Sequence, residues 1–131
     1  MRCLLLHGIG GSPFETAPLA EALAAAGFEA HAPALPGHGG TEEAYLASSF
    51  ALWRDFAHAE YARLSESGPV LLAGYSLGGI LALDVAQAAA RGELPPAQIK
   101  LIGHQEAMFE TMMLGLRMTE GVSERAFEAQ N

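Results

Sequence analysis

The sequence predicts one α/β domain with three layers, in which helices cover both faces of a short, mostly parallel sheet. Three short segments have the length and composition of strands: residues 3–6 and 69–73, which are apolar runs, and residues 28–35, which alternate. The segments between them repeat apolar residues at the helical period. Strands that alternate with helices through short loops favour right-handed crossovers and parallel pairing. The 131 residues are enough to bury a core. We therefore expect a single domain, with residues 1–90 as its core and residues 91–131 as a helical tail.

The first strand, residues 3–6, is a continuous apolar run that ends in a glycine-rich loop, which is typical of a central strand. A helix follows, and two residues are candidates for its N-cap. Ser12 is followed by Glu15 at capping-box spacing, but Pro18 would then lie inside the helix. Thr16 is the preferred N-cap because it places Pro18 in the first turn, where proline is tolerated.

Residues 28–35 form the second predicted strand, which a glycine-rich turn ends. Residues 41–49 are expected to be a loop with one turn of helix. The next helix covers about residues 50–65, and Ser48 or Ser49 supplies its cap. The apolar residues of this helix that keep the helical period are Phe50, Trp53, Phe56 and Ala57.

The third strand leads into the most informative stretch of the chain, residues 69–86. An apolar run, a serine between glycines and a helical pattern follow one another there. Residues 74–78 (GYSLG) match G-x-S-x-G, the nucleophile elbow, in which a sharp turn lifts a serine hydroxyl onto a helix N-terminus. Small residues two positions before and two positions after Ser76 meet a steric need, because the strand and helix backbones nearly touch there. On its own, the pattern also fits a glycine-rich loop with an inert serine.

Two glycine-rich loops, after Leu6 and after Ala73, are expected at the same edge of the sheet. Each follows the carboxyl end of a predicted parallel strand, and such ends meet at one edge. Ligands of open parallel sheets bind there. We therefore expect the functional site at this edge.

Three motifs follow one another along the chain: residues 4–13 (LLLHGIGGSP), 35–41 (LPGHGGT) and 74–79 (GYSLGG). In order and spacing they resemble the α/β-hydrolase superfamily, and within it the small carboxylesterases and monoacylglycerol-lipase-like enzymes. The resemblance covers about residues 1–90. It implies a truncated α/β-hydrolase fold.

The resemblance also implies roles for individual residues. Ser76 would be the nucleophile, and the backbone N–H groups of Ile9 and Leu77 would form the oxyanion hole. Attack on an ester builds negative charge on the carbonyl oxygen, and one rigid N–H donor at that position is worth roughly 3 kcal/mol. A small ester is the implied substrate, and neither a metal nor a cofactor is implied.

The partners that would activate the serine are not identified by the sequence. In this superfamily an Asp or Glu and then a His follow the serine in the chain. Asp84 lies eight residues into the predicted helix, roughly 12 Å along its axis from Ser76, which is too far to orient a base. His104, with Glu106 or Glu110 as its partner, is the remaining candidate base.

The other histidines are assigned structural roles. By the resemblance, His7 and His38 belong to the loops in which they lie, while His31 and His58 are packed or solvated residues. Two functions therefore stay open. One is a carboxylesterase-like serine hydrolase with an incomplete triad. The other is a catalytically inactive hydrolase-fold remnant or chimera that acts as a binding or interaction module.

The tail carries a second resemblance. Residues 104–127 look like the C-terminal region of oxygen-independent coproporphyrinogen III oxidase-like proteins, and the likeness covers about residues 92–131. The chemistry of that family cannot transfer, because its cluster needs a three-cysteine motif and this chain has only Cys3. Apolar residues at helical spacing predict a Met-rich helix: Phe109, Met112, Met113 and Leu116.

The tail also bears on the edge of the sheet. In a complete hydrolase, later strands pair with the strand before the serine. An apolar strand without such neighbours invites association. We therefore expect that residues 99–102 pair with it, that the Met-rich helix covers it, or that a second copy or a partner chain docks there.

Composition restricts partners and location. Seven basic and fifteen acidic residues give a formal net charge of -8, which disfavours nucleic acid and anionic membranes as partners. The single cysteine excludes an internal disulfide and fits a reducing compartment. No apolar run approaches membrane-spanning length, so the expected location is the cytoplasm.

Overall fold

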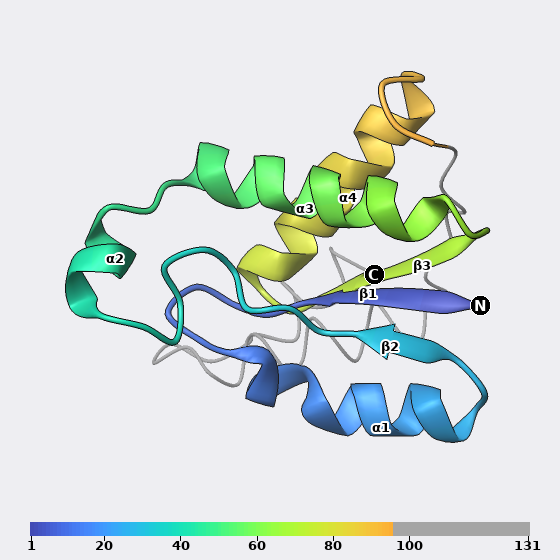
Figure 1. Cartoon of the computed structure of the whole chain (residues 1–131), viewed down its shortest axis with the longest axis horizontal. Helices are drawn as coiled ribbons and strands as arrows, with labels where there is room; N and C mark the ends of the chain where they lie inside the picture. The colour runs from blue at the N-terminus through green and yellow to red at the C-terminus, as the bar shows by residue number, and fades with distance from the viewer. Residues whose placement is uncertain (96–131) are drawn as a thin grey trace, which may run out of the picture. The chain divides into compact units, whose positions relative to one another are not determined.

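The structure, a computed structural model, describes residues 1–95 of the 131-residue chain. Strands and helices alternate along these residues, and a short 3₁₀ helix, η1, precedes the first α-helix (Figure 1). The elements are β1 (Arg2–Leu6), η1 (Pro13–Thr16), α1 (Ala17–Ala25), β2 (Glu29–His31), α2 (Glu42–Leu46), α3 (Phe50–Ser65), β3 (Val70–Gly74) and α4 (Leu77–Ala90). This order confirms the predicted α/β class.

The strands of the described residues form one parallel sheet in the order β2-β1-β3, so β1 lies in the middle. Leu4 of β1 pairs with His31 of β2 on one side and with Leu72 of β3 on the other. The pairing with β3 continues to Leu6 opposite Gly74, so β1 and β3 end together. Because the strands are parallel, each connection between consecutive strands must cross over the sheet, and helices lie in these connections.

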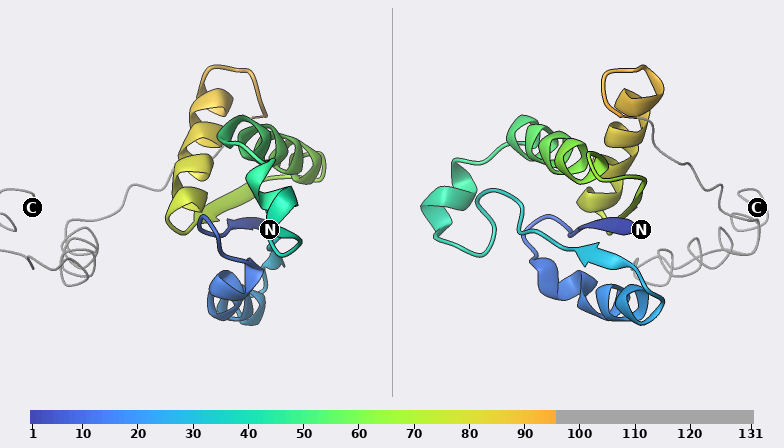
Figure 2. Two further views of the ribbon diagram at one scale, coloured as in Figure 1. Left: turned by 90° about the vertical axis from the view of Figure 1, so that its left-hand side faces the viewer. Right: turned by 45° about the vertical axis from the view of Figure 1, so that its right-hand side comes forward.

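Helices cover both faces of this sheet. α1 lies on one face, and α3 and α4 lie on the other (Figures 1 and 2). Residues 3–6 of β1 are at most 1% exposed, which explains their unbroken apolar run. Only Leu4 and Leu6 of this run belong to the core cluster beside α3 and α4, whose other members are Leu35, Trp53, Ala57, Tyr61, Leu64, Val70, Leu77, Leu81, Val85 and Ala89.

The predicted second strand, residues 28–35, was wrong in its extent. β2 spans only Glu29–His31, and its pairing with β1 stops at Leu4. Pro33 has no N–H group for a strand ladder. The N–H of Leu35 donates to the ring of His7 at 2.9 Å instead of to a strand. The chain therefore leaves the sheet before the loop that carries the second glycine-rich motif.

The two candidate N-caps of the first helix, Ser12 and Thr16, have different roles. The Ser12 hydroxyl accepts a hydrogen bond from the Phe14 N–H at 3.3 Å and begins η1. α1 begins directly after Thr16, as predicted. The Thr16 hydroxyl donates to the Pro13 carbonyl at 2.9 Å and does not cap α1.

The helical turn and the cap predicted after the second strand are confirmed. The Thr41 hydroxyl accepts from the Ala44 N–H at the start of α2, and the Ser49 hydroxyl accepts from the Leu52 N–H at the start of α3. Phe50 was expected on the buried side of α3 but is 45% exposed in the first turn. The buried residues of α3 are Trp53, Ala57, Tyr61 and Leu64.

The expectations for the tail lie outside the described residues. They concern the strand at residues 99–102 and the Met-rich helix. Within the described residues, β3 is an outer strand of the sheet. What pairs with that edge stays a prediction, as does a second copy or a partner chain there.

Candidate active site

The turn between β3 and α4 holds Ser76 in a conformation that few side-chain-bearing residues adopt. Its φ and ψ are 54° and −118°, and it is the one non-glycine residue with positive φ in the described part of the chain. Such a conformation is strained for an L-residue and persists only where the surrounding structure imposes it. Here a sharp change from strand to helix imposes it.

Gly74 and Gly78 let three backbones meet at this turn. A Cβ on Gly74 would lie 2.1 Å from the Gly78 carbonyl oxygen, and a Cβ on Gly78 would lie 1.9 Å from the Leu6 carbonyl oxygen. Both obstacles are backbone atoms, which cannot move aside as a flexible side chain can. The spacing of glycines around Ser76 is therefore required by the crossing of β1, β3 and α4.

The loop after β1 lies beside Ser76. A Cβ on Gly8 would stand 3.5 Å from the Ser76 Cβ and 3.3 Å from the Tyr75 ring. The Tyr75 N–H donates to the Leu6 carbonyl at 2.9 Å, which continues the β1–β3 pairing up to the serine. The structure thus brings the two glycine-rich loops together at the carboxyl edge of the sheet, as the sequence predicts.

Three of the four amide N–H groups in residues 8–11 donate to acceptors within this loop and its neighbours. The N–H of Ile9 has no acceptor among the described residues, and neither has the N–H of Leu77 at the start of α4. The pairs are Gly8 N with Glu15 Oε2 at 3.0 Å, Gly10 N with His38 Nε2 at 3.0 Å, and Gly11 N with the Gly8 carbonyl oxygen at 3.1 Å.

His7 is fully buried, and both of its ring nitrogens are engaged. Nε2 accepts from the Leu35 N–H at 2.9 Å and so carries no proton. Nδ1 then carries the proton and donates it to the Gly8 carbonyl at 2.9 Å. The ring therefore joins the loop after β1 to the segment after β2, with no nitrogen left to act as a base.

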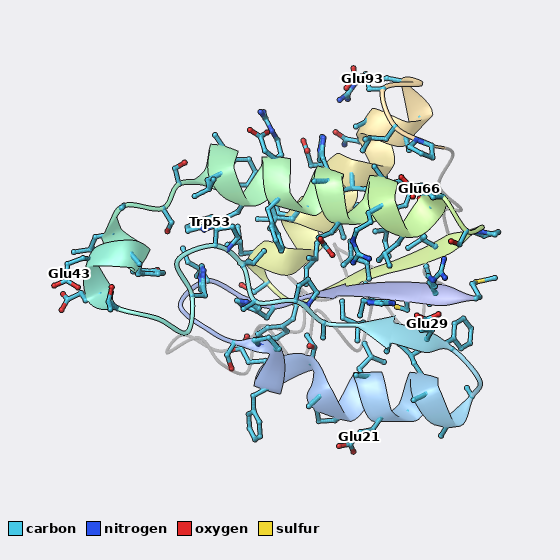
Figure 3. All side chains as sticks on the ribbon, viewed as in Figure 1. Glu21, Glu29, Glu43, Trp53, Glu66 and Glu93 are labelled. Carbon is cyan, nitrogen blue, oxygen red and sulfur yellow. The ribbon has the colours of Figure 1, made fainter. Side chains whose placement is uncertain are left out.

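His38 supports the same loop from the other side. Its Nε2 accepts from the Gly10 N–H, so Nδ1 is the donor toward the Pro36 carbonyl at 3.3 Å. The ring packs edge-on against Tyr45 and Trp53, with centroids 5.1 and 5.3 Å away. Trp53 extends from α3 (Figure 3) and donates its indole N–H to the same Pro36 carbonyl at 2.9 Å. The LPGHGGT motif is thereby held against the first glycine-rich loop.

Glu15 also contacts the first glycine-rich loop, and its capping-box spacing does not predict this contact. A capping-box glutamate turns back to the N–H of its own N-cap, which here is Ser12. The Glu15 carboxylate instead reaches the Gly8 N–H, seven residues earlier in the chain. The signal available in the sequence is an acidic residue that shortly follows a glycine-rich loop.

A pocket of about 310 Å³ borders the first glycine-rich loop. Its walls are Gly10, Gly11, residues 37–42 and Tyr45. Glu42 contributes the one carboxylate of this lining, so the pocket suits a neutral or cationic group. Ser76 is not among the residues that line it.

The remaining histidines of the described residues pair with carboxylates elsewhere. His31 Nε2 lies 3.0 Å from Glu29 Oε1, and this hydrogen bond, together with Arg2, holds the pKa of Glu29 below its ordinary value. His58 Nε2 lies 2.6 Å from Asp84 Oδ2 and joins α3 to α4. Asp84 therefore has a partner away from the serine.

Among the described residues, neither a histidine nor a carboxylate makes a hydrogen bond to the Ser76 hydroxyl. The candidate His104 and its proposed partners, Glu106 and Glu110, lie outside them. Within residues 1–95, no three His, Cys, Asp or Glu side chains gather in a way that could hold a metal ion. In the same part of the chain, every helix is too short or too polar to cross a membrane.

Comparison with known proteins identifies the family. The model of the alpha/beta hydrolase family matches residues 3–127, and so extends through most of the tail. The comparisons give no support to a resemblance between residues 92–131 and coproporphyrinogen III oxidase-like proteins.

Two curated relatives are esterases or lipases. A thermostable monoacylglycerol lipase from Bacillus sp. (strain H-257) is 36% identical over 85 residues, which cover 64% of this chain and 34% of the relative. A pimeloyl-acyl-carrier-protein methyl ester esterase from Aromatoleum aromaticum is 36% identical over 100 residues, which cover 76% of this chain and 36% of the relative. The chain thus spans about a third of the length of these relatives.

Solved structures agree with the family. A structure from work on LipS and LipT, two metagenome-derived lipolytic enzymes, has a TM-score of 0.62 at 33% identity and covers 71% of this chain and 38% of that chain. An extracellular alpha/beta-hydrolase from a Paenibacillus species has a TM-score of 0.55 at 21% identity, covers 66% of this chain and 35% of that chain, and supports the fold alone. From its motifs, its parallel sheet and these matches, the chain belongs to the alpha/beta hydrolase family.

Proposed function

We propose that this chain carries the nucleophile and the oxyanion hole of a serine hydrolase that cleaves small carboxylic esters. The Ser76 oxygen bonds to the ester carbonyl carbon as its proton passes to a base. The backbone N–H groups of Ile9 and Leu77 stabilise the negative oxygen that forms. The alcohol leaves with a proton, and water then hydrolyses the acyl-serine to release the acid. The names of the relatives, a monoacylglycerol lipase and a methyl ester esterase, support this substrate class.

The observation that carries the proposal is the strained backbone of Ser76 next to Gly8. A positive φ at a serine costs on the order of 1–3 kcal/mol and is concentrated at functional sites. The strained residue is also the one that the motif predicts as the nucleophile. The strain therefore falls at the predicted nucleophile and beside the loop that would supply the first N–H donor. Chance does not readily explain this coincidence.

The Ser76 hydroxyl is not used to cap α4, although the residue stands at the N-cap position. Ser12 and Ser49, at the starts of other helices, do use their hydroxyls as caps. A serine at an N-cap ordinarily accepts a hydrogen bond from the first turn. The α4 N-terminus therefore keeps its positive end, including the Leu77 N–H, for a negative charge that develops at the serine.

The base decides how active the chain is. His7 and His38 are occupied by loop contacts, and His58 is paired with Asp84. In subtilisin, removal of the histidine of the triad costs on the order of 10⁶ in turnover. A binding module without efficient catalysis is thus the second candidate function, and the observation that favours it is that, among the described residues, no histidine is hydrogen-bonded to the Ser76 hydroxyl.

Reaction with a fluorophosphonate probe separates the two functions. If the chain is a serine hydrolase, the probe labels one site, and Ser76→Ala abolishes the labelling while Ser67→Ala leaves it unchanged. Ser67 is an exposed turn residue and serves as the matched control. Labelling of the native chain that is no faster than that of Ser76→Ala would instead support the binding module.

A further inference from the structure

We propose that Glu15 is a positioning residue for the oxyanion loop, residues 8–11. Its carboxylate holds the Gly8 N–H, and this contact helps to orient the Ile9 N–H toward substrate. The inference rests on the proposed function, because the Ile9 N–H is assigned there as an oxyanion donor. The hydrogen bond between the Gly8 N–H and the Glu15 carboxylate does not depend on that assignment.

The carboxylate of Glu15 fits into a space that the loop leaves for it. Oε2 accepts from the Gly8 N–H at 3.0 Å. A Cβ on Gly11 would lie 2.3 Å from Oε2, 2.5 Å from Cδ and 2.6 Å from Oε1. Any side chain at position 11 would therefore displace the carboxylate. The position of the Glu15 carboxylate thus depends on Gly11, because only a residue without a side chain leaves space for it there.

The local fold delivers Glu15 to this place. The Ser12 cap and the hydrogen bond from the Glu15 N–H to the Ser12 carbonyl, 3.1 Å, make the tight turn of η1. In the described residues Glu15 has no ion-pair partner. Its hydrogen bond to Gly8 is therefore a charge-assisted contact in which no cation competes for the carboxylate.

The consequence for Ile9 follows from the planarity of the peptide bond. The Gly8 carbonyl and the Ile9 N–H belong to one plane and point in opposite directions. That carbonyl is held by His7 Nδ1 at 2.9 Å and by the Gly11 N–H at 3.1 Å. Glu15 holds the preceding plane through the Gly8 N–H. Hydrogen bonds thus fix the peptide planes on both sides of the Gly8 Cα, although glycine has the most flexible backbone of all residues.

Hydrogen exchange in the full chain tests the contact without any need for activity. We expect the Gly8 amide to exchange about 10- to 100-fold faster in Glu15→Ala, because a hydrogen bond to a charged group is lost. Glu15→Gln keeps an oxygen acceptor and should retain most of the protection. Glu21→Ala removes an exposed carboxylate on α1 (Figure 3) and is the matched control. Equal Gly8 exchange in Glu15→Ala and Glu21→Ala overturns the proposal.

The rate of Ser76 labelling by the fluorophosphonate tests the positioning role. We expect Glu15→Ala to slow labelling about tenfold, because a misaligned oxyanion donor stabilises the charged state less well. Glu15→Gln should stay closer to the native rate, and Glu21→Ala should match it. Equal rates in Glu15→Ala and Glu21→Ala overturn the positioning role. A native chain that does not label at all overturns the proposed function, and the Gly8 exchange rate then decides the Glu15 contact by itself.

Discussion

Gly78, in the first turn of α4, lies so close to the end of β1 that a Cβ there would stand 1.9 Å from the Leu6 carbonyl oxygen. At the next residue, Gly79, the nearest atom to an added Cβ is the Gly74 carbonyl oxygen at 3.4 Å, an ordinary contact. Two adjacent glycines of one helix thus have opposite steric surroundings. The first is required by packing, and the second is not.

Alanine substitutions at these two positions should therefore diverge. Gly78→Ala should lower the free energy of unfolding by about 2–4 kcal/mol, since α4 must move away from the sheet. Gly79→Ala should be neutral or should raise it by up to about 1 kcal/mol, because alanine is the better helix former. Urea denaturation measures both. Equal losses at the two positions would contradict the crossing described for β1 and α4.

Replacement of His7 by leucine should destabilise the fold. The substitution leaves the buried Leu35 N–H without its acceptor and removes one of two donors to the Gly8 carbonyl, so we expect a loss of about 2–4 kcal/mol. His31→Leu, which removes a partly exposed contact to Glu29, should cost less than about 1 kcal/mol. Chemical denaturation compares the two variants. A His7→Leu protein as stable as His31→Leu would mean that the ring does not join the two loops.

The pair formed by His58 and Asp84 should contribute to stability and not to catalysis. The two side chains join α3 to α4 at 2.6 Å and are partly buried. Asp84→Ala should cost about 1 kcal/mol, and the double variant with His58→Ala should cost less than the sum of the single ones. The labelling rate of Ser76 should stay within about twofold of the native rate. A large loss of labelling in Asp84→Ala would place this carboxylate in the active site after all.

Cys3 should be unreactive in the folded chain. The side chain is fully buried in β1, and burial raises the pKa of its thiol from 9.0 to about 11. The unfolded chain ionises near the ordinary value, so stability is kept below pH 9 and falls as the pH rises toward 11. Iodoacetamide at pH 8 should modify Cys3 only after urea unfolds the chain. Cys3→Ala should flatten the alkaline limb of the stability curve.

The sequence predicts the elements of this fold well because their signals are local. An apolar run, a capping serine or a glycine next to a serine acts within a few residues, and β1, α3 and the turn at Ser76 are found where such signals lie. The second strand was predicted too long because its end depends on a distant group. The N–H of Leu35 donates a hydrogen bond to the ring of His7, 28 residues away, and no local sequence pattern predicts this contact.

The site is predicted less completely for the same reason. The motifs identify Ser76, Ile9 and Leu77 as candidates, and the structure places the loop of Ile9 beside Ser76. The hydrogen bonds of the loop are not readable from the motifs. Glu15 in particular has the spacing of a helix cap, and only the fold brings Gly8 within reach of its carboxylate.

The central place of β1 in the sheet affects how the chain folds during synthesis. Leu6 is opposite Gly74, so the pairing of β1 with β3 must wait until the intervening residues have been made. At about 5–20 residues per second, Gly74 is made roughly 3–14 s after Leu6. Throughout that interval an apolar strand lacks its permanent neighbour on one side, and long-range parallel pairing is slow to form even afterwards. Until β3 is made, the β3-facing edge of β1 therefore stays open to association with other chains.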